Sequence, residues 1–132
     1  MINQTKSNVI KIIYTSDRVP QLYQLTSLTV HLSSIASLPD SIGQLTQLTY
    51  LNIRGNDSLT SLPDSIGQLT KLTHLDIGNN KLRSLPDSIG QLNKLTDLHL
   101  WFNPSLTSLP VSLNNISTLE ILDFRGCYAL TS

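Results

Sequence analysis

Histidine and aspartate residues recur in this sequence at intervals close to a single period. His74 is followed by Asp97 after 23 residues, and Asp76 is followed by His99 after 23 residues and by Asp123 after a further 24. Histidine nitrogen and aspartate oxygen atoms at neighbouring positions could bind a metal ion. The same residues could instead form charge and hydrogen-bond pairs between adjacent strands. The pattern favours pairing, because an open sheet gives a metal site little support from surrounding groups.

The spacing of these residues follows from an internal repeat. Residues 72–82 read L-x-x-L-x-L-x-x-N-x-L, and related segments occupy residues 25–33, 48–56, 95–103 and 119–127. A second landmark, Leu-Pro-Asp-Ser-Ile-Gly, begins at positions 38, 62 and 85, and a degenerate copy, Leu-Pro-Val-Ser-Leu-Asn, begins at position 109. Five copies at a nearly fixed period predict a stack of similar coils.

This pattern resembles the leucine-rich repeat family. The Leu-Pro-x-x-Ile-Gly-x-Leu signature is similar to that of the bacterial and Ras-scaffold-like type, with repeats of about 23 residues. The resemblance implies an α/β leucine-rich repeat solenoid, a short curved arc with a concave parallel β-sheet and a convex side of short helical or 3₁₀ turns. Residues 17–132 are predicted to form five repeats, with strands near residues 28–30, 51–53, 75–77, 98–100 and 122–124. Residues 1–16 are predicted to be an N-terminal flank, with a capping strand or half-repeat at about residues 9–14.

The residues of one repeat predict its local structure. Pro63 ends the preceding extended stretch, and Asp64 and Ser65 are favourable N-cap residues for a short helical turn. Apolar residues then recur at every third position and, after Thr73, at every second position. Each repeat should therefore contain one short turn and one strand, with its leucines and isoleucines facing inward.

The residues that alternate with the inward-facing ones are predicted to lie on the concave face. All three histidines and the only tryptophan of the chain fall there, whereas the convex signature repeats almost unchanged. Tryptophan, tyrosine and arginine most often carry the binding energy of protein interfaces. We therefore predict a partner-binding surface formed by Tyr50, Asn52, Arg54, His74, Asp76, Asp97, His99, Trp101, Asp123 and Arg125.

Trp101 allows two interpretations. It could be a free anchor for a partner, with a shallow notch at Gly78, between Arg54 and Trp101, that receives a partner side chain. It could instead pack over the gap at Gly78 and against the stem of Arg125.

A separate column of asparagines is predicted to be structural. Asn56, Asn80 and Asn103 follow successive strands, where their amide groups can bond the backbone of adjacent repeats. Ser33 and Cys127 occupy the same column at the two ends. Because the family pattern accepts cysteine at this position, we interpret Cys127 as a buried structural thiol.

Composition limits the partners and the location of the protein. The net charge is 0 and charged residues make up 14% of the chain, which argues against binding to nucleic acid. No apolar stretch approaches the length needed for membrane insertion, and the polar start of the chain predicts no secretory signal. A single cysteine favours a reducing, cytoplasmic compartment, with delivery into a host cell if the protein is an effector.

The sequence predicts no catalytic residues, no cofactor and no bound metal. It contains no Gly-rich phosphate loop, and the repeated Asp-Ser-Ile-Gly is a turn element. The first hypothesis is a non-catalytic protein–protein interaction module that binds a protein partner of unknown identity through its concave face. The alternatives are a structural or recognition arm of a larger bacterial effector or scaffold protein and, more weakly, a metal-binding sheet. Apolar residues of the last repeat also predict self-association through that end of the stack.

Overall fold

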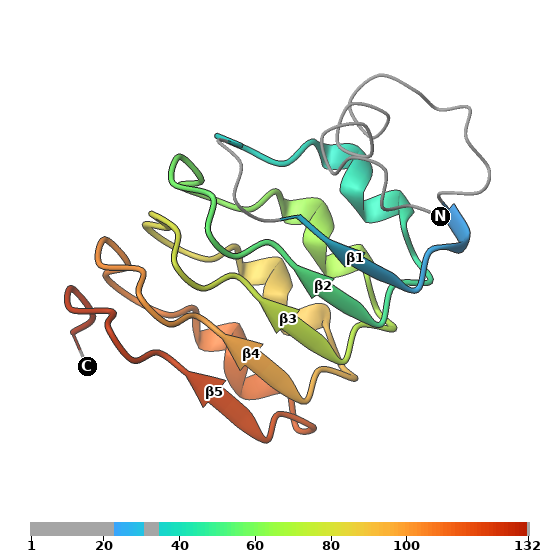
Figure 1. Cartoon of the computed structure of the whole chain (residues 1–132). Helices are drawn as coiled ribbons and strands as arrows, with labels where there is room; N and C mark the ends of the chain where they lie inside the picture. The colour runs from blue at the N-terminus through green and yellow to red at the C-terminus, as the bar shows by residue number, and fades with distance from the viewer. Residues whose placement is uncertain (1–22, 31–34, 132) are drawn as a thin grey trace.

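The structure is a computed structural model, and it describes residues 23–30 and 35–131. Five short strands form one parallel sheet in the order of the chain (Figure 1). They are β1 (Ser27–Thr29), β2 (Tyr50–Asn52), β3 (His74–Asp76), β4 (Asp97–His99) and β5 (Ile121–Asp123). The capping strand or half-repeat predicted at about residues 9–14 lies outside the described residues.

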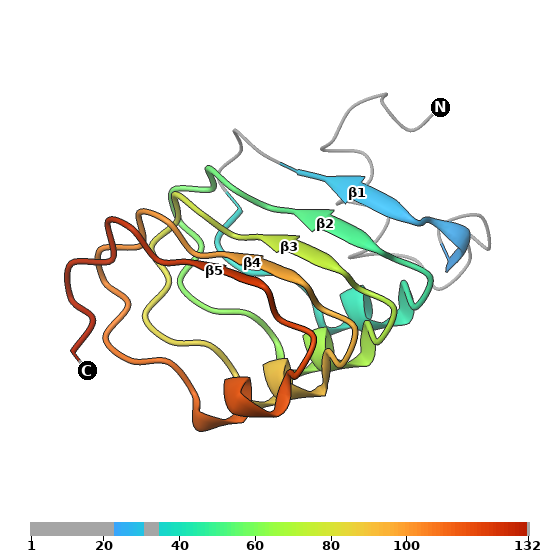
Figure 2. The same cartoon turned by 90° about the horizontal axis from the view of Figure 1, so that it is seen from below.

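Short 3₁₀ helices form a second layer opposite the sheet, as Figure 2 shows. They are η2 (Asp40–Gln44), η3 (Asp64–Gln68), η4 (Asp87–Gln91) and η5 (Val111–Asn115). We call each helix, the strand that follows it and the next loop one coil, and number the coils by their strands. The predicted α/β solenoid with short convex turns is confirmed.

The strands begin and end one residue earlier than predicted. β2, for example, covers Tyr50–Asn52, whereas the prediction was 51–53. Ile53 still faces the core and its backbone N–H still donates to the carbonyl of Asp76 at 2.8 Å. The inward pattern therefore extends one residue beyond the regular strand, and backbone bonding to the next coil continues at Gly55, whose N–H donates to the Gly78 carbonyl at 3.1 Å.

The 3₁₀ helices lack the side-chain caps predicted for Asp64 and Ser65. The N-cap of η3 is Pro63, in an extended conformation and without a side-chain hydrogen bond. The turn is held by backbone bonds from Ile66 N–H to the Pro63 carbonyl (3.0 Å) and from Leu69 N–H to the Ile66 carbonyl (3.2 Å). Such bonds between residues three apart match the apolar period of three.

The hydrophobic core is a row of leucines and isoleucines between the two layers. Leu51, Leu75 and Leu98 of the strands and Ile66 and Ile89 of the helices are fully buried. Each of these coils packs on a neighbour at either side, so the core is continuous along the stack. This packing fixes the inward side chains of the strands. Because side chains alternate across a strand, the packing also sets where the outward side chains lie.

The asparagine column joins the coils on the loop side of the sheet. The Asn80 amide donates to the carbonyl of Ile53 in coil 2 (3.1 Å) and to that of Ile77 in its own coil (2.9 Å). Asn56 and Asn103 are also fully buried and bond the carbonyls of their own and the preceding coil in the same way. These amides satisfy carbonyls that no strand partner reaches.

Cys127 occupies the asparagine position of coil 5. Its thiol lies 3.1 Å from the carbonyl oxygen of Leu100, the counterpart of the bonds made by the asparagines to the preceding coil. Burial raises the pKa of the Cys127 thiol, which keeps the proton that this bond requires. Ser33, at the other end of the column, lies outside the described residues.

Candidate functional site

The outward strand residues form two complete columns across the concave sheet. Strand register places residues of neighbouring coils side by side in each column. The first column is Ser27, Tyr50, His74, Asp97 and Ile121, and the second is Thr29, Asn52, Asp76, His99 and Asp123. Of the three histidines expected on this face, His31 lies outside the described residues.

A chain of histidine, aspartate and arginine contacts crosses coils 3, 4 and 5. His74 Nε2 lies 3.6 Å from Asp97 Oδ1, and Asp97 Oδ2 lies 4.0 Å from His99 Nε2. His99 Nδ1 lies 3.9 Å from Asp123 Oδ2, which accepts a 2.6 Å bond from Arg125. His99 thus pairs with Asp97 and Asp123, although its register partner in β3 is an aspartate as well.

The strongest pair of this chain is Asp123 with Arg125. The guanidinium donates through Nε to Oδ1 (2.8 Å) and through Nη2 to Oδ2 (2.6 Å). These bonds lower the pKa of Asp123 to about 2, and they raise the pKa of Arg125. Because the Arg125 side chain is 87% exposed, water weakens the contribution of this pair to stability.

The histidine–aspartate chain is not arranged as a metal site. No group of three or more histidine, cysteine, aspartate or glutamate side chains in the described part of the chain could hold a metal ion. His99 directs its two ring nitrogens toward two different carboxylates, which spreads these groups along a line. The contacts of His74 with Asp97 and of His99 with Asp123 are cross-strand pairs of the kind that the sequence favoured, whereas His99 and Asp97 lie in the same strand.

Thr73, His74 and Asp97 lie in the order of a nucleophile, a base and an acid. Thr73 Oγ1 is 2.8 Å from His74 Nδ1, and His74 Nε2 is 3.6 Å from Asp97. The Thr73 hydroxyl, however, donates its proton to the Thr49 carbonyl at 3.0 Å. Thr49 and Thr96 make the same bond to the strand before them. The threonine is therefore a structural link between coils, and its hydroxyl is not activated by the histidine.

Three residues of the second column close the turn that follows their strand. The side-chain Oδ1 atoms of Asn52, Asp76 and Asp123 each accept the backbone N–H two residues later, at 3.1, 3.0 and 3.2 Å. Sequence reasoning assigned these positions to partner binding and, for Asp76 and Asp123, to metal binding or cross-strand pairing, but not to the turn. The missed signal was the preference of Asn and Asp for turns of this kind. Only 6% of the Asn52 surface is exposed, and its amide donates a hydrogen bond to the Tyr50 hydroxyl.

Trp101 packs over Gly78, which is the first of the two contacts in the second interpretation, whereas packing against the stem of Arg125 stays a prediction. A Cβ atom added at Gly78 would overlap the indole ring, so only glycine fits beneath it. The predicted notch for a partner side chain at Gly78 is therefore wrong, because the indole fills it. Trp101 remains partly exposed, whereas Arg54 and His74 are exposed and Tyr50 is 37% exposed.

Phe102 is a feature that sequence reasoning did not single out. Its φ is +55°, at a position where coils 2, 3 and 5 have Gly55, Asn79 and Gly126, all with positive φ. A bulky side chain is disfavoured in this conformation. Its ring is nevertheless 46% exposed at the rim of the concave face, beside Trp101.

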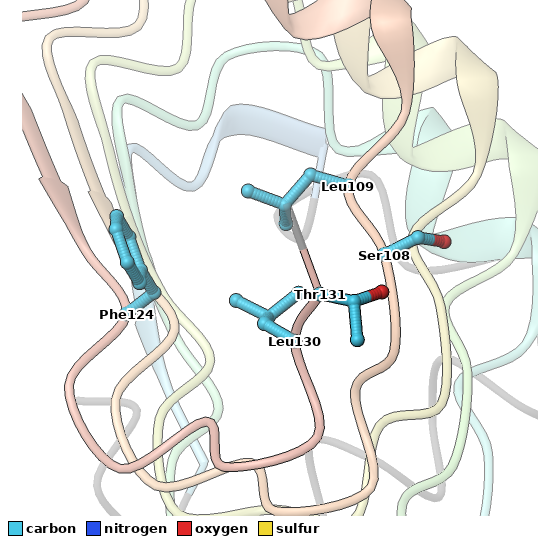
Figure 3. Close-up of a pocket in the computed structure, with 5 residues that line it drawn as sticks. All are labelled: Ser108, Leu109, Phe124, Leu130 and Thr131. Atoms are coloured by element: carbon cyan, nitrogen blue, oxygen red, sulfur yellow. The ribbon is translucent and has the colours of Figure 1, made fainter.

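The C-terminal end of the stack carries an apolar hollow of about 670 Å³. Figure 3 shows Phe124, Leu109 and Leu130 directed into it, with Ser108 and Thr131 at one side. Phe124 is 49% exposed, although the equivalent residues Ile77 and Leu100 are fully buried. The difference arises because no described coil covers coil 5.

The described residues contain no helix with the length and apolar character that a membrane crossing requires.

The repeats, the strand register and the asparagine column together define a protein class. The profile of a family described as the leucine-rich repeat region matches residues 13–128. The chain belongs to the leucine-rich repeat family. No curated protein matches the sequence closely enough to count as a relative.

Solved structures of bacterial proteins of this class are similar to the chain. A leucine-rich repeat protein of Leptospira interrogans is 38% identical with a TM-score of 0.69, over 80% of this chain and 27% of that one. The leucine-rich repeat domain of the type III effector XopL of Xanthomonas is 33% identical with a TM-score of 0.75, over 83% of this chain and 40% of that one.

A plant receptor is similar over a shorter part. The peptide hormone receptor RGFR1, solved in complex with RGF2, is 35% identical with a TM-score of 0.63, over 74% of this chain and 16% of that one. The chain thus spans less than half the length of each of these three proteins. Proteins of this family are typically non-catalytic and commonly serve in protein–protein interaction.

Proposed function

We propose that the protein is a non-catalytic binding module and that its concave face, together with the adjoining rim, binds a protein partner. The observation that carries the proposal is the gathering of exposed aromatic and arginine side chains on this one face. Tyr50, Trp101 and Phe102 are at least partly exposed there, and the exposed Arg54 lies in the loop that follows β2. Residues of these types dominate the energy of protein interfaces.

Two further observations support this proposal. Outward side chains of the strands are not fixed by core packing, so they can differ between coils without loss of the fold. The similar plant receptor was solved in complex with RGF2, which shows that a related solenoid has a peptide or protein ligand. A rigid sheet also presents its side chains with little rearrangement on binding.

The proposal can be tested with a displayed library of random peptides selected on the immobilised protein. Synthetic versions of the selected peptides are then titrated against the wild type, Tyr50→Ala, Trp101→Ala and the control Lys94→Ala, which alters an exposed residue between η4 and β4. We expect affinity to fall at least about tenfold for the concave variants and to be unchanged for the control. Peptides that bind all four proteins equally would contradict the proposal.

A structural or recognition arm of a larger effector or scaffold protein is the alternative function. It is supported by the lengths of the similar structures, of which this chain spans 40% or less. Such an arm would show no affinity for peptides of its own, so the same selection separates it from the first proposal.

Self-association through coil 5 is a second property that we propose. The exposed Phe124 and the apolar hollow beside Leu109 and Leu130 support it, because apolar surface of this kind is commonly covered in solution. Light scattering over a concentration series should show a reversible dimer for the wild type and a monomer for Phe124→Gln. Val111→Gln is the control, since Val111 is 81% exposed on the convex side. A wild-type monomer at every concentration would refute self-association.

A cytoplasmic location, with delivery into a host cell in the case of an effector, remains our prediction for the compartment. The buried thiol of the only cysteine is compatible with it. Fractionation of the source cells, with a tagged protein, would test it.

A further inference from the structure

In three coils the turn that ends the strand is closed by a side-chain oxygen, and this bond requires no charge. In coils 2, 3 and 5 the acceptor for the backbone N–H two residues later is Oδ1 of Asn52, Asp76 or Asp123. The bond has nearly the same length in all three coils. Since the neutral amide of Asn52 closes the turn as well as a carboxylate does, the negative charges of Asp76 and Asp123 have another cause.

The charge of Asp123 is used within the molecule. Both of its carboxylate oxygens accept bonds from the guanidinium of Arg125, and His99 lies beside them. Asp76 differs. Its Oδ1 accepts the Gly78 N–H, but its carboxylate forms no ion pair with any lysine, arginine or histidine of the described residues.

Asp76 is also half-buried, which makes an unpaired charge unfavourable there. A carboxylate that is partly removed from water and lacks a cation is destabilising relative to a neutral amide of the same shape. Local features that weaken a fold without an evident structural gain are expected at binding sites. A ligand that supplies a cation would make the favourable charge interaction that Asp76 lacks in the isolated protein, and this interaction would contribute to the free energy of binding.

The neighbours of Asp76 on its two sides, Asn52 and Gly78, each contact an aromatic side chain. The Tyr50 hydroxyl accepts a bond from Asn52, the register partner of Asp76 in β2. The Trp101 indole lies over Gly78, the residue whose N–H binds Asp76. Aromatic faces beside a carboxylate favour a guanidinium or ammonium group, through cation–π attraction as well as charge.

We propose that Asp76 is the charge-selecting residue of the concave face, and that it binds an arginine or lysine side chain of the protein partner between Tyr50 and Trp101. This inference rests on the proposed function and adds the chemistry of the ligand to it. The occupant is therefore a polypeptide segment with a basic residue at its centre.

The test uses Asp76→Asn, because Asn52 shows that asparagine preserves the turn. Asp64→Asn is the control: it makes the same substitution and removes the same charge at an exposed residue of the convex helix η3, outside the concave face. The probes are the peptides selected from the displayed random library, together with versions in which each arginine or lysine is replaced by glutamine. Thermal unfolding of both variants first verifies that they are folded.

We expect the selected peptides to share a basic residue, and Asp76→Asn to weaken their binding about tenfold. Asp64→Asn should change it by less than about twofold, because Asp64 lies on the convex layer and away from the concave face. Replacement of the basic residue by glutamine should cost the wild type the same factor but leave the affinity of Asp76→Asn unchanged. The four affinities form a double-mutant cycle. If the two substitutions do not add, Asp76 and the basic residue of the peptide interact directly.

The outcomes separate this inference from the proposed function. Peptides that depend on Trp101 but lack a basic residue, or that bind Asp76→Asn as tightly as the wild type, overturn the role of Asp76 and leave the binding face intact. If no peptide depends on Trp101 or Tyr50, both proposals fail. If Asp76→Asn does not fold, the glutamine-substituted peptides on the wild type decide alone, and equal affinity of the two peptide forms refutes the inference.

Discussion

The convex and concave layers of this solenoid respond to opposite constraints. On the convex side η2, η3 and η4 have the identical sequence Asp-Ser-Ile-Gly-Gln. On the concave side no two of the strands β1 to β5 have the same sequence. Both layers repeat along the same stack, so the period alone does not explain the difference.

Close approach of neighbouring turns explains the convex identity. A Cβ atom added at Gly67 would lie 2.6 Å from the carbonyl oxygen of Ser88 and 2.9 Å from its Cβ. The Ser88 hydroxyl is itself buried without a hydrogen-bond partner, so this serine is present for its small size. The glycine of one coil and the serine of the next therefore form a pair that other residues cannot replace.

The fifth coil shows what happens when this constraint is lifted. η5 has Asn114 at the glycine position and begins with Val111 in place of aspartate, and both are exposed. η4 packs on one side of this turn, and no described coil packs on its other side. The comparison teaches that sequence identity marks contact between coils, whereas sequence diversity marks surface that packing leaves free for recognition.

The largest effect is expected for Gly67→Ala, which tests the convex half of this comparison. The added methyl group meets backbone of coil 4, so the two turns must separate, and we expect a loss of about 2 kcal/mol in the free energy of unfolding. Urea denaturation followed by circular dichroism measures it. Asn114→Ala, at the same position of coil 5, should change stability by less than about 0.5 kcal/mol. Equal effects at the two positions would show that coil contact is not the cause.

A smaller effect of opposite sign is expected for Phe102→Gly at the concave rim. Glycine relieves the positive φ that the phenylalanine adopts, and we expect a gain of about 0.5–1 kcal/mol in the free energy of unfolding. Phe102→Ala should give no gain, because alanine loses the ring and keeps most of the strain. If neither variant is more stable than the wild type, the backbone at Phe102 is unstrained and the phenylalanine needs no functional explanation.

The smallest effect is expected for the ion pair of Asp123 and Arg125. The pKa of Asp123 is depressed from 3.8 to about 2 in the folded protein, so its contribution to stability is complete above pH 4. This contribution decreases as the pH falls toward 2, where the folded carboxylate gains its proton. Arg125→Gln should therefore lower the melting temperature slightly at pH 6 and leave it unchanged near pH 2. A deficit of the same size at both values would indicate lost packing of the arginine stem.

Much of the site was predictable from the sequence because the fold is periodic. Aligning the repeats places Tyr50 beside His74 and Asp76 beside His99, and the strand register has the same order. What the alignment cannot give is the direction in which each long side chain turns. His99 pairs with Asp97 of its own strand and with Asp123, and the alignment alone made Asp76 an equal candidate.

The ends of the structural elements could not be predicted from the sequence either. Asp64 and Ser65 have the chemistry of N-caps, yet the tight stacking of the convex turns buries the serine and leaves Pro63 as the cap. Propensity describes an isolated helix, and here the neighbouring coil decides the outcome.

The sequence by itself determined the period, the inward and outward alternation and the asparagine column, because each depends on the spacing of residues along one chain. Tertiary structure decided which side chains remain available to a partner. Trp101 covers Gly78, Asn52 is buried near Tyr50, and Asp76 keeps an unpaired charge between them. The physical reason is that a column in an alignment fixes only Cα positions, whereas exposure and pairing depend on the reach and rotamer of side chains from three coils at once.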